Sequence, residues 1–351
     1  MKPLRVISLL FVLLLITGFG IDLWFRHEFH TPFAHNHASQ YIEVPRGSSP
    51  GEIVERLAAT GIIKHAWPLR IYIKAKGADS RLKAGEYRFP SPISPQQVLQ
   101  KLEEGQQRLN RFTVIEGWTR WDVAAAMARL PEFQLQSADE ALRLMDDVNL
   151  ITDLDPQATN LEGYLYPDTY TFPPDTSARE MVTIMVRRFR EVWKEKSAIQ
   201  SNVANRPLRE VATVASLIET EAKLKEERPL VASVIYNRLQ TGIPLGIDST
   251  VIYAAKLAGK WKADGKVYQS DLDRASPYNT RKVHGLPPGP IASFGARSLE
   301  AALNPATTDY LYYVRDPARD DGAHNFYNND IDFNRGVQAL REWERNRNSN
   351  E

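Results

Sequence analysis

Two glutamates in the segment 211–225 (VATVASLIETEAKLK), Glu219 and Glu221, carry carboxyl groups that could serve as a general acid and base. The segment predicts a helix with one apolar stripe, formed by Val211, Val214, Ala215, Ile218 and Ala222. At about 100° per residue, the two glutamates flank this stripe on opposite sides. Periodicity alone therefore leaves open which carboxyl group does chemistry.

The neighbours of the two glutamates at helical spacings differ in size. Glu219 is flanked by small side chains that would let a bulky substrate approach, namely Ala212, Ala215, Ser216 and Ala222. Glu221 is crowded by the larger side chains Val214, Leu217 and Leu224. Each glutamate also has a lysine four residues later, so two surface salt bridges are the alternative interpretation, and spacing alone favours it.

Other common kinds of catalytic site have no support in the sequence. It contains no G-x-S-x-G, H-E-x-x-H, Walker A or G-x-G-x-x-G pattern and no cysteine. Only His284 and His324 lie beyond residue 65, so we expect neither a metal centre nor a cofactor. Lys and Arg number 44 against 43 Asp and Glu, and this balance argues against nucleic-acid binding through bulk charge. Among the common kinds of catalytic site, acid–base catalysis by carboxyl groups is the one that the sequence still allows.

The first 39 residues predict an anchor and a tether. Lys2 and Arg5 precede an apolar run, and residues 1–25 together reach the length of a transmembrane helix. A cleaved signal peptide is the alternative, but no small-x-small cleavage site follows the run. Because positive charge precedes the span, we expect a cytoplasmic N-terminus with the remaining chain outside. Residues 26–39 predict a linker.

Strand–glycine–helix units follow from residue 40. Tyr41–Val44 alternates like a strand, and Gly47 turns the chain toward a capped helix. Residues 112–127 repeat this plan around Gly117. Such units resemble the LysM-like modules that bind bacterial wall glycan, so we group residues 40–145 as a LysM-like subdomain. A small packing domain without glycan binding is the alternative.

Longer helical patterns dominate the rest of the chain. They cover about 178–196, 208–225 and 228–239, and a strand-like segment lies at 310–314. Helices outnumber strands and do not alternate regularly with them, which predicts an α+β fold. Residues 146–345 form the predicted catalytic domain, and 346–351 form a tail.

Several blocks with recognisable composition occur along the chain in a fixed order. They are EGYLYPDTY (162–170), ASLIETEA (215–222), Arg228, VASV (231–234), YNRL (236–239), DSTVIY (248–253), SPYNT (276–280) and GLPPGPI (285–291). Together they resemble the endolytic murein transglycosylases (the MltG/YceG-like family). With the anchor and the LysM-like region in the family's order, the resemblance covers nearly the whole chain.

This resemblance implies a larger, mostly helical, lysozyme-like catalytic domain on the periplasmic side of the bacterial inner membrane. It implies cleavage of the MurNAc-β-1,4-GlcNAc bond of peptidoglycan glycan strands without water, leaving a 1,6-anhydro end. The family's catalytic acid maps onto Glu219, which would act first as acid and then as base. We expect sugar hydroxyls and acetamido groups to be bound by Tyr236, Asn237, Asp248, Tyr278 and Asn279, with loop and helix capping as the alternative.

Two other functions remain open from the sequence. One is a membrane-anchored peptidoglycan-binding scaffold without catalysis, and the other is a hydrolytic muramidase with Asp248 as base to Glu219. Product analysis separates the three, because they give anhydro ends, reducing ends or no cleavage. The resemblance also implies partners among the peptidoglycan synthases (penicillin-binding proteins), where the enzyme would terminate nascent glycan strands.

Overall fold

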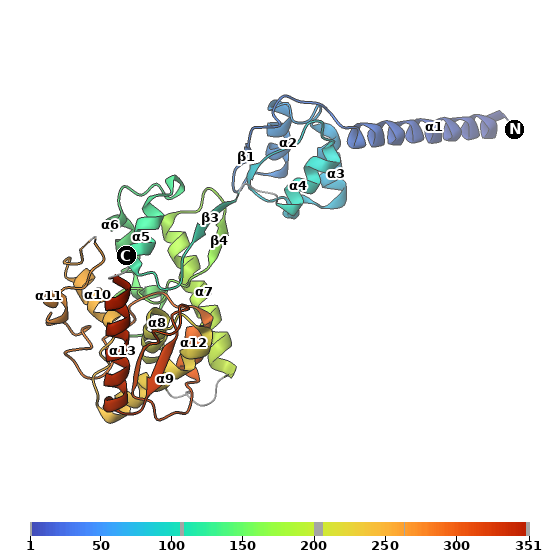
Figure 1. Ribbon diagram of the computed structural model, residues 1–351. Coiled ribbons are helices and arrows are strands. Elements are labelled where there is room, and N and C mark those ends of the chain that lie inside the picture. Colours follow the sequence, from blue (N-terminus) through green and yellow to red (C-terminus); the bar gives the residue numbers. More distant parts are fainter. Residues whose placement is uncertain (1, 106–108, 200–205, 263, 349–351) are drawn as a thin grey trace. The chain divides into compact units, whose positions relative to one another are not determined.

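The computed structural model describes residues 2–105, 109–199, 206–262 and 264–348. Most of these residues are helical, and the strands among them form three two-stranded sheets (Figure 1). This mixture of helices and small sheets confirms the predicted α+β class. Residues 346–348 continue the last helix, and the rest of the predicted tail lies outside the described residues. The chain divides into two compact units.

The first unit comprises Met1–Arg111 and Thr171–Asp175. Its elements are α1 (Lys2–His30), β1 (Ile42–Val44), α2 (Pro50–Ala59), α3 (Trp67–Lys76), β2 (Gly85–Tyr87) and α4 (Pro95–Glu104), with β1 and β2 antiparallel. Ser49 and Ser94 begin α2 and α4 with capping boxes. Each serine hydroxyl accepts a hydrogen bond from the backbone N–H of Glu52 or Gln97, and the side chain of that residue accepts one from the serine backbone N–H. The strand and the capped helix predicted on either side of Gly47 are confirmed.

The long helix α1 does not confirm the predicted anchor. Among the described residues, no helix is both long and apolar enough to cross a membrane. The apolar side chains at residues 6–11 lie outside those described. The helix runs unbroken for 29 residues to His30, so it includes the start of the predicted linker. Its last turn is held by packing, since Phe29 is 2% exposed and its ring stacks on Tyr72 at 4.4 Å.

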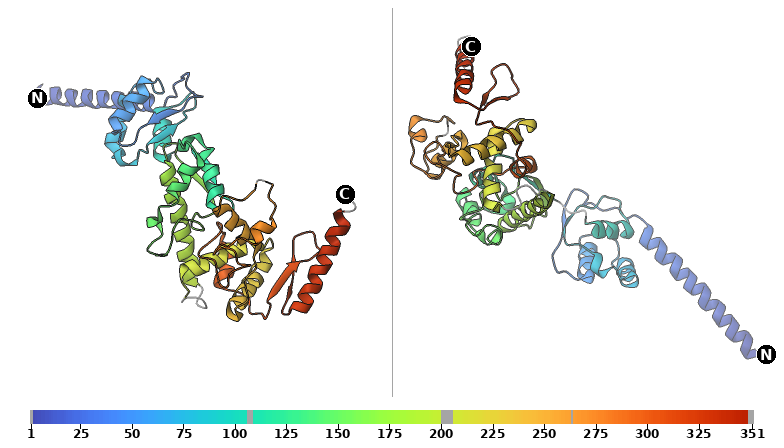
Figure 2. Two further views of the ribbon diagram at one scale, coloured as in Figure 1. Left: turned by 90° about the vertical axis from the view of Figure 1, so that its left-hand side faces the viewer. Right: turned by 90° about the horizontal axis from the view of Figure 1, so that it is seen from below.

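The second unit comprises Phe112–Tyr170 and Thr176–Glu351. Its helices are α5 (Arg120–Ala128), α6 (Ala138–Leu144), α7 (Ala178–Ile199), α8 (Leu208–Glu221), α9 (Arg228–Thr241), α10 (Asp248–Leu257), α11 (Gln269–Leu272), α12 (Ala296–Leu303) and α13 (Asp330–Asn348). β5 (Tyr312–Arg315) pairs antiparallel with β6 (His324–Tyr327), and α13 packs along this hairpin (Figure 2).

Helix α8 lies at the centre of this unit. It packs against α9, α10 and α12, and every residue from Val211 to Ile218 is buried. The helix ends at Glu221, four residues earlier than predicted, because Ala222 is extended with φ −94° and ψ 108°. Lys223 and Lys225 therefore do not follow the glutamates at helical positions, which removes the predicted i,i+4 salt bridges.

The division between the units falls inside the paired strands β3 (Asn110–Thr113) and β4 (Thr169–Phe172), well before the predicted boundary at residue 145. The second strand–glycine–helix repeat therefore belongs to the second unit. Two contacts explain this placement. The Gly117 N–H donates to the Ser293 carbonyl at 2.8 Å, and the Arg120 N–H at the start of α5 donates to the Glu162 carboxylate at 3.1 Å.

Candidate active site

Glu219 is buried in an ion pair. Its side chain is 4% exposed and lies against Arg228 at the start of α9. The guanidinium donates to both carboxylate oxygens, at 2.9 Å to Oε1 and 3.1 Å to Oε2, and the Gly295 N–H donates to Oε2 at 2.9 Å. Because arginine and a backbone N–H can only donate, all these bonds require Glu219 oxygens that accept. A carboxyl group that must donate a proton to a substrate does not fit this arrangement.

The ion pair joins three helices. Arg228 also donates to the Ser298 hydroxyl on α12 at 2.7 Å, so α8, α9 and α12 meet at one guanidinium. Glu116 lies beside the pair, and burial, together with the charge of Glu219, raises the pKa of Glu116. Breaking a buried ion pair by removing one partner is strongly destabilising. The contacts of Glu219 are those of a structural residue.

Glu221 has different surroundings, although it lies only two residues further along α8. The hydroxyl of Tyr313 on β5 donates to its Oε2 at 2.9 Å. The Ser249 hydroxyl, at the start of α10, approaches Oε1 at 3.4 Å and accepts a bond from Thr220 at 2.8 Å. No cation of the described residues forms an ion pair with Glu221. Neutral hydroxyl groups can serve either protonation state of this carboxyl group, since each can donate or accept.

The protonation of Glu221 is set mainly by burial. Desolvation raises its pKa, the hydrogen bond from Tyr313 lowers it, and the nearby charge of Asp248 raises it. His324 acts in the opposite direction to Asp248. The net direction is upward, which favours a carboxyl group that can donate a proton near neutral pH.

His324 is held in place beside this site by Glu227. Its backbone N–H and its Nδ1 each lie 2.8 Å from a Glu227 carboxylate oxygen. The imidazole ring meets the Tyr313 ring edge-on, with centroids 5.3 Å apart. The pair therefore supports the phenol that bonds Glu221.

A cleft of about 340 Å³ lies along α10, and we call it the α10 cleft. It is lined by Gly117, Thr119, Thr220, Ser249, Ile252, Tyr253, Lys256, Ile291 and Ala292. Thr220 is adjacent to Glu221 in sequence, and Ser249 approaches its carboxylate, so the cleft and the carboxyl group share a wall. Its volume is at the lower end of the range of small-molecule sites.

A second carboxyl group is buried behind the Tyr253 wall of this cleft. Glu162 is 3% exposed, and burial raises its pKa to about 7 against the opposing effect of the Arg120 N–H and of a hydrogen bond with Tyr253. Because it binds the first backbone N–H of α5, it acts as a helix cap. It has no surface from which to reach a substrate.

Three of the predicted substrate-binding residues are occupied inside the protein. The Tyr236 hydroxyl donates to the Ala302 carbonyl at 2.8 Å, and the Asn237 amide donates to the Thr308 and Tyr310 carbonyls, each at 2.9 Å. Asn279 is fully buried, and its amide donates to the Leu272 and Arg274 carbonyls, each at 2.9 Å. These contacts are the capping roles that the sequence left as the alternative.

The other two predicted residues lie nearer the α10 cleft. Asp248 is close enough for its charge to raise the pKa of Glu221, and its exposed carboxylate forms an ion pair with Arg281 at 2.6 Å. Tyr278 packs on the cleft residue Tyr253, with ring centroids 4.8 Å apart. Of the five predicted binding residues, only Asp248 is therefore placed beside the carboxyl group of Glu221.

Sequence reasoning did not single out Tyr313, Ser249 or His324 as site residues. Ser249 lies in the DSTVIY block and Tyr313 in the strand-like segment, but neither position carries a local signal for contact with Glu221. Tyr313 lies 92 residues from Glu221 in the chain, so only the tertiary fold brings the two together.

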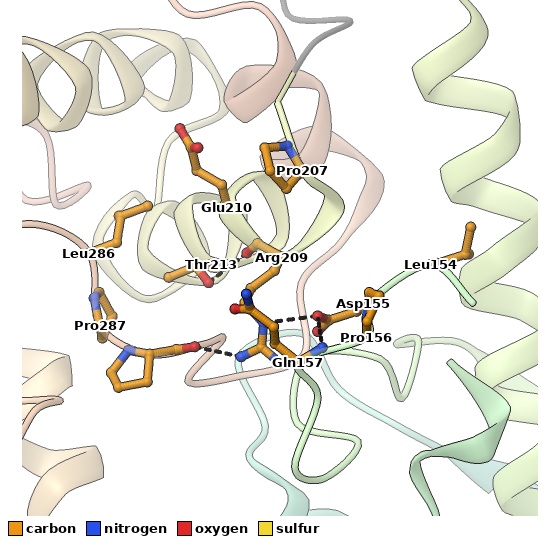
Figure 3. Close-up of a pocket in the computed structure, with 11 residues that line it drawn as sticks. Leu154, Asp155, Pro156, Gln157, Pro207, Arg209, Glu210, Thr213, Leu286 and Pro287 are labelled. Atoms are coloured by element: carbon orange, nitrogen blue, oxygen red, sulfur yellow. Dashed lines mark hydrogen bonds and ion pairs between the residues drawn. The ribbon is translucent and has the colours of Figure 1, made fainter. Parts of the chain in front are cut away.

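Another cavity, of about 450 Å³, lies toward the opposite end of α8 (Figure 3). Arg209 points into it, and its guanidinium donates to Asp155 at 2.9 Å and to the Pro288 carbonyl at 2.5 Å. Asp155 in turn accepts from the buried Tyr164 hydroxyl at 2.5 Å. Because Thr213 at its edge lies about 12 Å along the helix from Glu221, this cavity is separate from the carboxyl group.

Comparison with known proteins points to one family. The profile of the YceG-like family matches residues 42–339. An endolytic murein transglycosylase of Bacillus subtilis (strain 168) is 38% identical over 290 residues, which is 78% of each chain. One from Streptococcus pneumoniae serotype 2 is 29% identical over 84% of this chain, which spans 57% of that protein. A crystal structure of a YceG-like protein from Listeria monocytogenes aligns with a TM-score of 0.55 and 32% identity, covering 84% of this chain and 98% of the other.

Proposed function

Because the chain belongs to the YceG-like family, we propose that it is an endolytic murein transglycosylase, a lyase, and that Glu221 is its catalytic acid. The observation that carries the residue assignment is the contrast on α8. Glu221 has neutral hydroxyl partners near a cleft and a raised pKa, whereas both oxygens of Glu219 are bound by Arg228. The proposal replaces the sequence-based assignment of Glu219.

One carboxyl group is enough for this reaction. Protonated Glu221 gives its proton to the glycosidic oxygen between MurNAc and GlcNAc as the bond from that oxygen to the MurNAc C1 breaks. The C6 hydroxyl of the same MurNAc then bonds to C1 and closes a 1,6-anhydro ring. Its proton passes to the Glu221 carboxylate, which restores the acid. No water is consumed, and the protons balance.

The surroundings of Glu221 suit both halves of this cycle. Burial raises the pKa, which keeps the acid protonated at the start. The Tyr313 hydroxyl, 2.9 Å from Oε2, stabilises the carboxylate that forms after proton transfer. Because the Tyr313 hydroxyl is neutral, it lowers the pKa of Glu221 less than a cationic partner would. The two effects together favour a group that both donates and accepts a proton near neutral pH.

The hydrolytic muramidase is the second candidate function, because Asp248 lies close to Glu221. An inverting or retaining glycosidase needs a second carboxylate that attacks or activates water. Asp248 is instead ion-paired with Arg281 at 2.6 Å. Digestion of purified peptidoglycan followed by mass spectrometry tests the proposal. We expect anhydro-MurNAc ends. Reducing ends would favour the muramidase, and an absence of cleavage would favour the wall-binding scaffold.

The cellular setting is also part of the proposal. We place the second unit on the periplasmic side of the inner membrane, acting on nascent glycan near peptidoglycan synthases, with the first unit able to bind glycan. The full chain should then fractionate with the inner membrane. Recovery of a soluble form that starts near residue 26 would contradict the anchored location.

A further inference from the structure

Helix α1 projects from the other elements of the first unit (Figure 1), and its apolar side chains are exposed on all sides. The consecutive residues Val12, Leu13, Leu14 and Leu15 are 51%, 59%, 72% and 58% exposed. Because successive residues are about 100° apart, these four surround the helix. A protein partner covers one face of a helix, whereas acyl chains surround it, so the pattern fits lipid. From Val12 to Trp24 the helix is about 18 Å long, which is close to the hydrocarbon depth of one leaflet, about 15 Å.

A groove of about 460 Å³ lies between the end of this apolar run and α3, and we call it the α1–α3 groove. The rings of Trp24 and Trp67 stack in it with centroids 4.7 Å apart, and the Phe25 ring lies 5.9 Å from that of Trp67. Ile71, one turn after Trp67 on α3, also lines the groove and is 52% exposed. Tryptophan is enriched where a membrane meets water. The groove therefore continues the apolar surface of α1 onto α3, with the aromatic side chains that are typical of that depth.

The charged groups around the groove suit a layer of anionic lipid headgroups. Helix α3 contains no acidic residue and ends in Lys74 and Lys76, which are both exposed. Lys74 follows Ile71 at i+3, so the ammonium group and the apolar side chain share one face of the helix. Asp22, the acidic residue that lines the groove, is ion-paired with Arg26 at 2.8 Å. Basic side chains beside an apolar face are attracted to anionic lipid surfaces.

The segment after α1, predicted as a linker, is bonded to the folded part of the first unit. Phe33 and Ile93 exchange two backbone hydrogen bonds, at 2.9 and 3.0 Å. The His35 N–H donates to the Ser91 hydroxyl at 2.8 Å. Together with the stacking of Phe29 on Tyr72, these contacts fix α1 against α3. The depth of α1 in a bilayer therefore also sets the depth of α3.

From these observations we propose that the α1–α3 groove is a lipid-contact surface, which seats Trp67 and Ile71 at the boundary between headgroups and acyl chains. The inference rests on the membrane location proposed above and goes beyond it. It places one face of the folded first unit, and not only α1, in an anionic bilayer. The first unit would then lie against the membrane instead of moving freely on a tether.

Because the chain contains no cysteine, one thiol-reactive label can be placed at a chosen position. The full-length Ile71→Cys variant would carry a nitrobenzoxadiazole fluorophore in vesicles of phosphatidylethanolamine and phosphatidylglycerol. We expect the label to lose fluorescence with brominated acyl chains and to resist aqueous iodide, as a depth of about 5–10 Å in the headgroup–acyl boundary requires. Glu43→Cys is the matched control, because Glu43 is exposed on β1, and β1 lies on the side of the unit away from the projecting part of α1 (Figure 1). Iodide should quench this label, and brominated chains should not.

If Ile71→Cys lowers the unfolding temperature, Lys74→Cys, on the same face of α3, takes its place. Iodide quenching as strong as in the Glu43→Cys control would overturn the proposal, and so would a full-length chain that does not float with the vesicles. Protection from iodide without quenching by brominated chains, lost when the protein is diluted in lipid, would assign the groove to a second copy of the chain and also overturn it. The proposed catalytic function fails in a different way, by an absence of murein cleavage at any depth of the label.

Discussion

Substituting the two glutamates of α8 one at a time should give opposite phenotypes. Glu221→Gln keeps the size of the side chain but cannot transfer a proton, so the rate of peptidoglycan cleavage should fall at least about 10²–10⁴-fold. The unfolding temperature should stay equal or rise at neutral pH. The pKa of Glu221 is higher in the folded chain than in the unfolded chain. The folded state therefore loses stability as the pH rises above the pKa of the unfolded chain, and glutamine, which does not ionise, removes that loss.

Glu219→Gln should instead act on stability. It removes the negative charge between two guanidinium donors and the Gly295 N–H, and leaves Arg228, whose side chain is 9% exposed, without its counter-ion. Breaking a buried pair in this way costs about 3–5 kcal/mol. At about 2–4 °C per kcal/mol for a unit of this size, the unfolding temperature should fall by about 6–20 °C.

Both variants would be incubated with purified peptidoglycan below their unfolding temperatures, and anhydro-ended fragments would be counted beside thermal unfolding. The protein that folds and does not cleave should be Glu221→Gln. A Glu219→Gln protein with normal stability and no activity, beside an active Glu221→Gln protein, would refute the reasoning and restore Glu219 as the acid. Activity in both would remove α8 from the mechanism.

Three further predictions follow from single contacts. Tyr313→Phe removes a hydrogen bond that lowers the pKa of Glu221, so that pKa should rise and the alkaline limb of the kcat–pH profile should move to higher pH with the fold unchanged. Burial raises the pKa of Glu162 from 4.5 to about 7, so its ionisation should reduce stability as pH rises across that window, by on the order of 3 kcal/mol; Glu162→Gln should flatten the dependence of unfolding temperature on pH. Gly163 has φ +79°, and a Cβ there would lie 2.3 Å from the Pro290 side chain, so Gly163→Ala should lower the free energy of unfolding, measured by urea denaturation, by more than about 1 kcal/mol.

Local features of the fold could be predicted from the sequence because their causes are local. The capping box at Ser49 involves a partner three residues away, and the strand before it is formed by alternating residues of one short segment. Helices α7, α8 and α9 begin where the apolar pattern predicts. The end of α8 was not predictable, because nothing in the residues after Glu221 stops a helix locally.

The sequence by itself placed two candidate carboxyl groups on one helix and indicated the family to which the chain belongs, since both depend on residue types in a given order. It could not determine which carboxyl group reacts, because Glu219 and Glu221 flank the same stripe and differ only in what the rest of the chain brings to them. Arg228, nine residues later, neutralises one, and Tyr313, 92 residues away, bonds the other without an ionic partner. The same is true of Asn237 and Asn279, whose amides bind backbone carbonyls in the interior. Charge compensation and burial arise from contacts between distant segments, so only the tertiary structure decided which partners each polar group has.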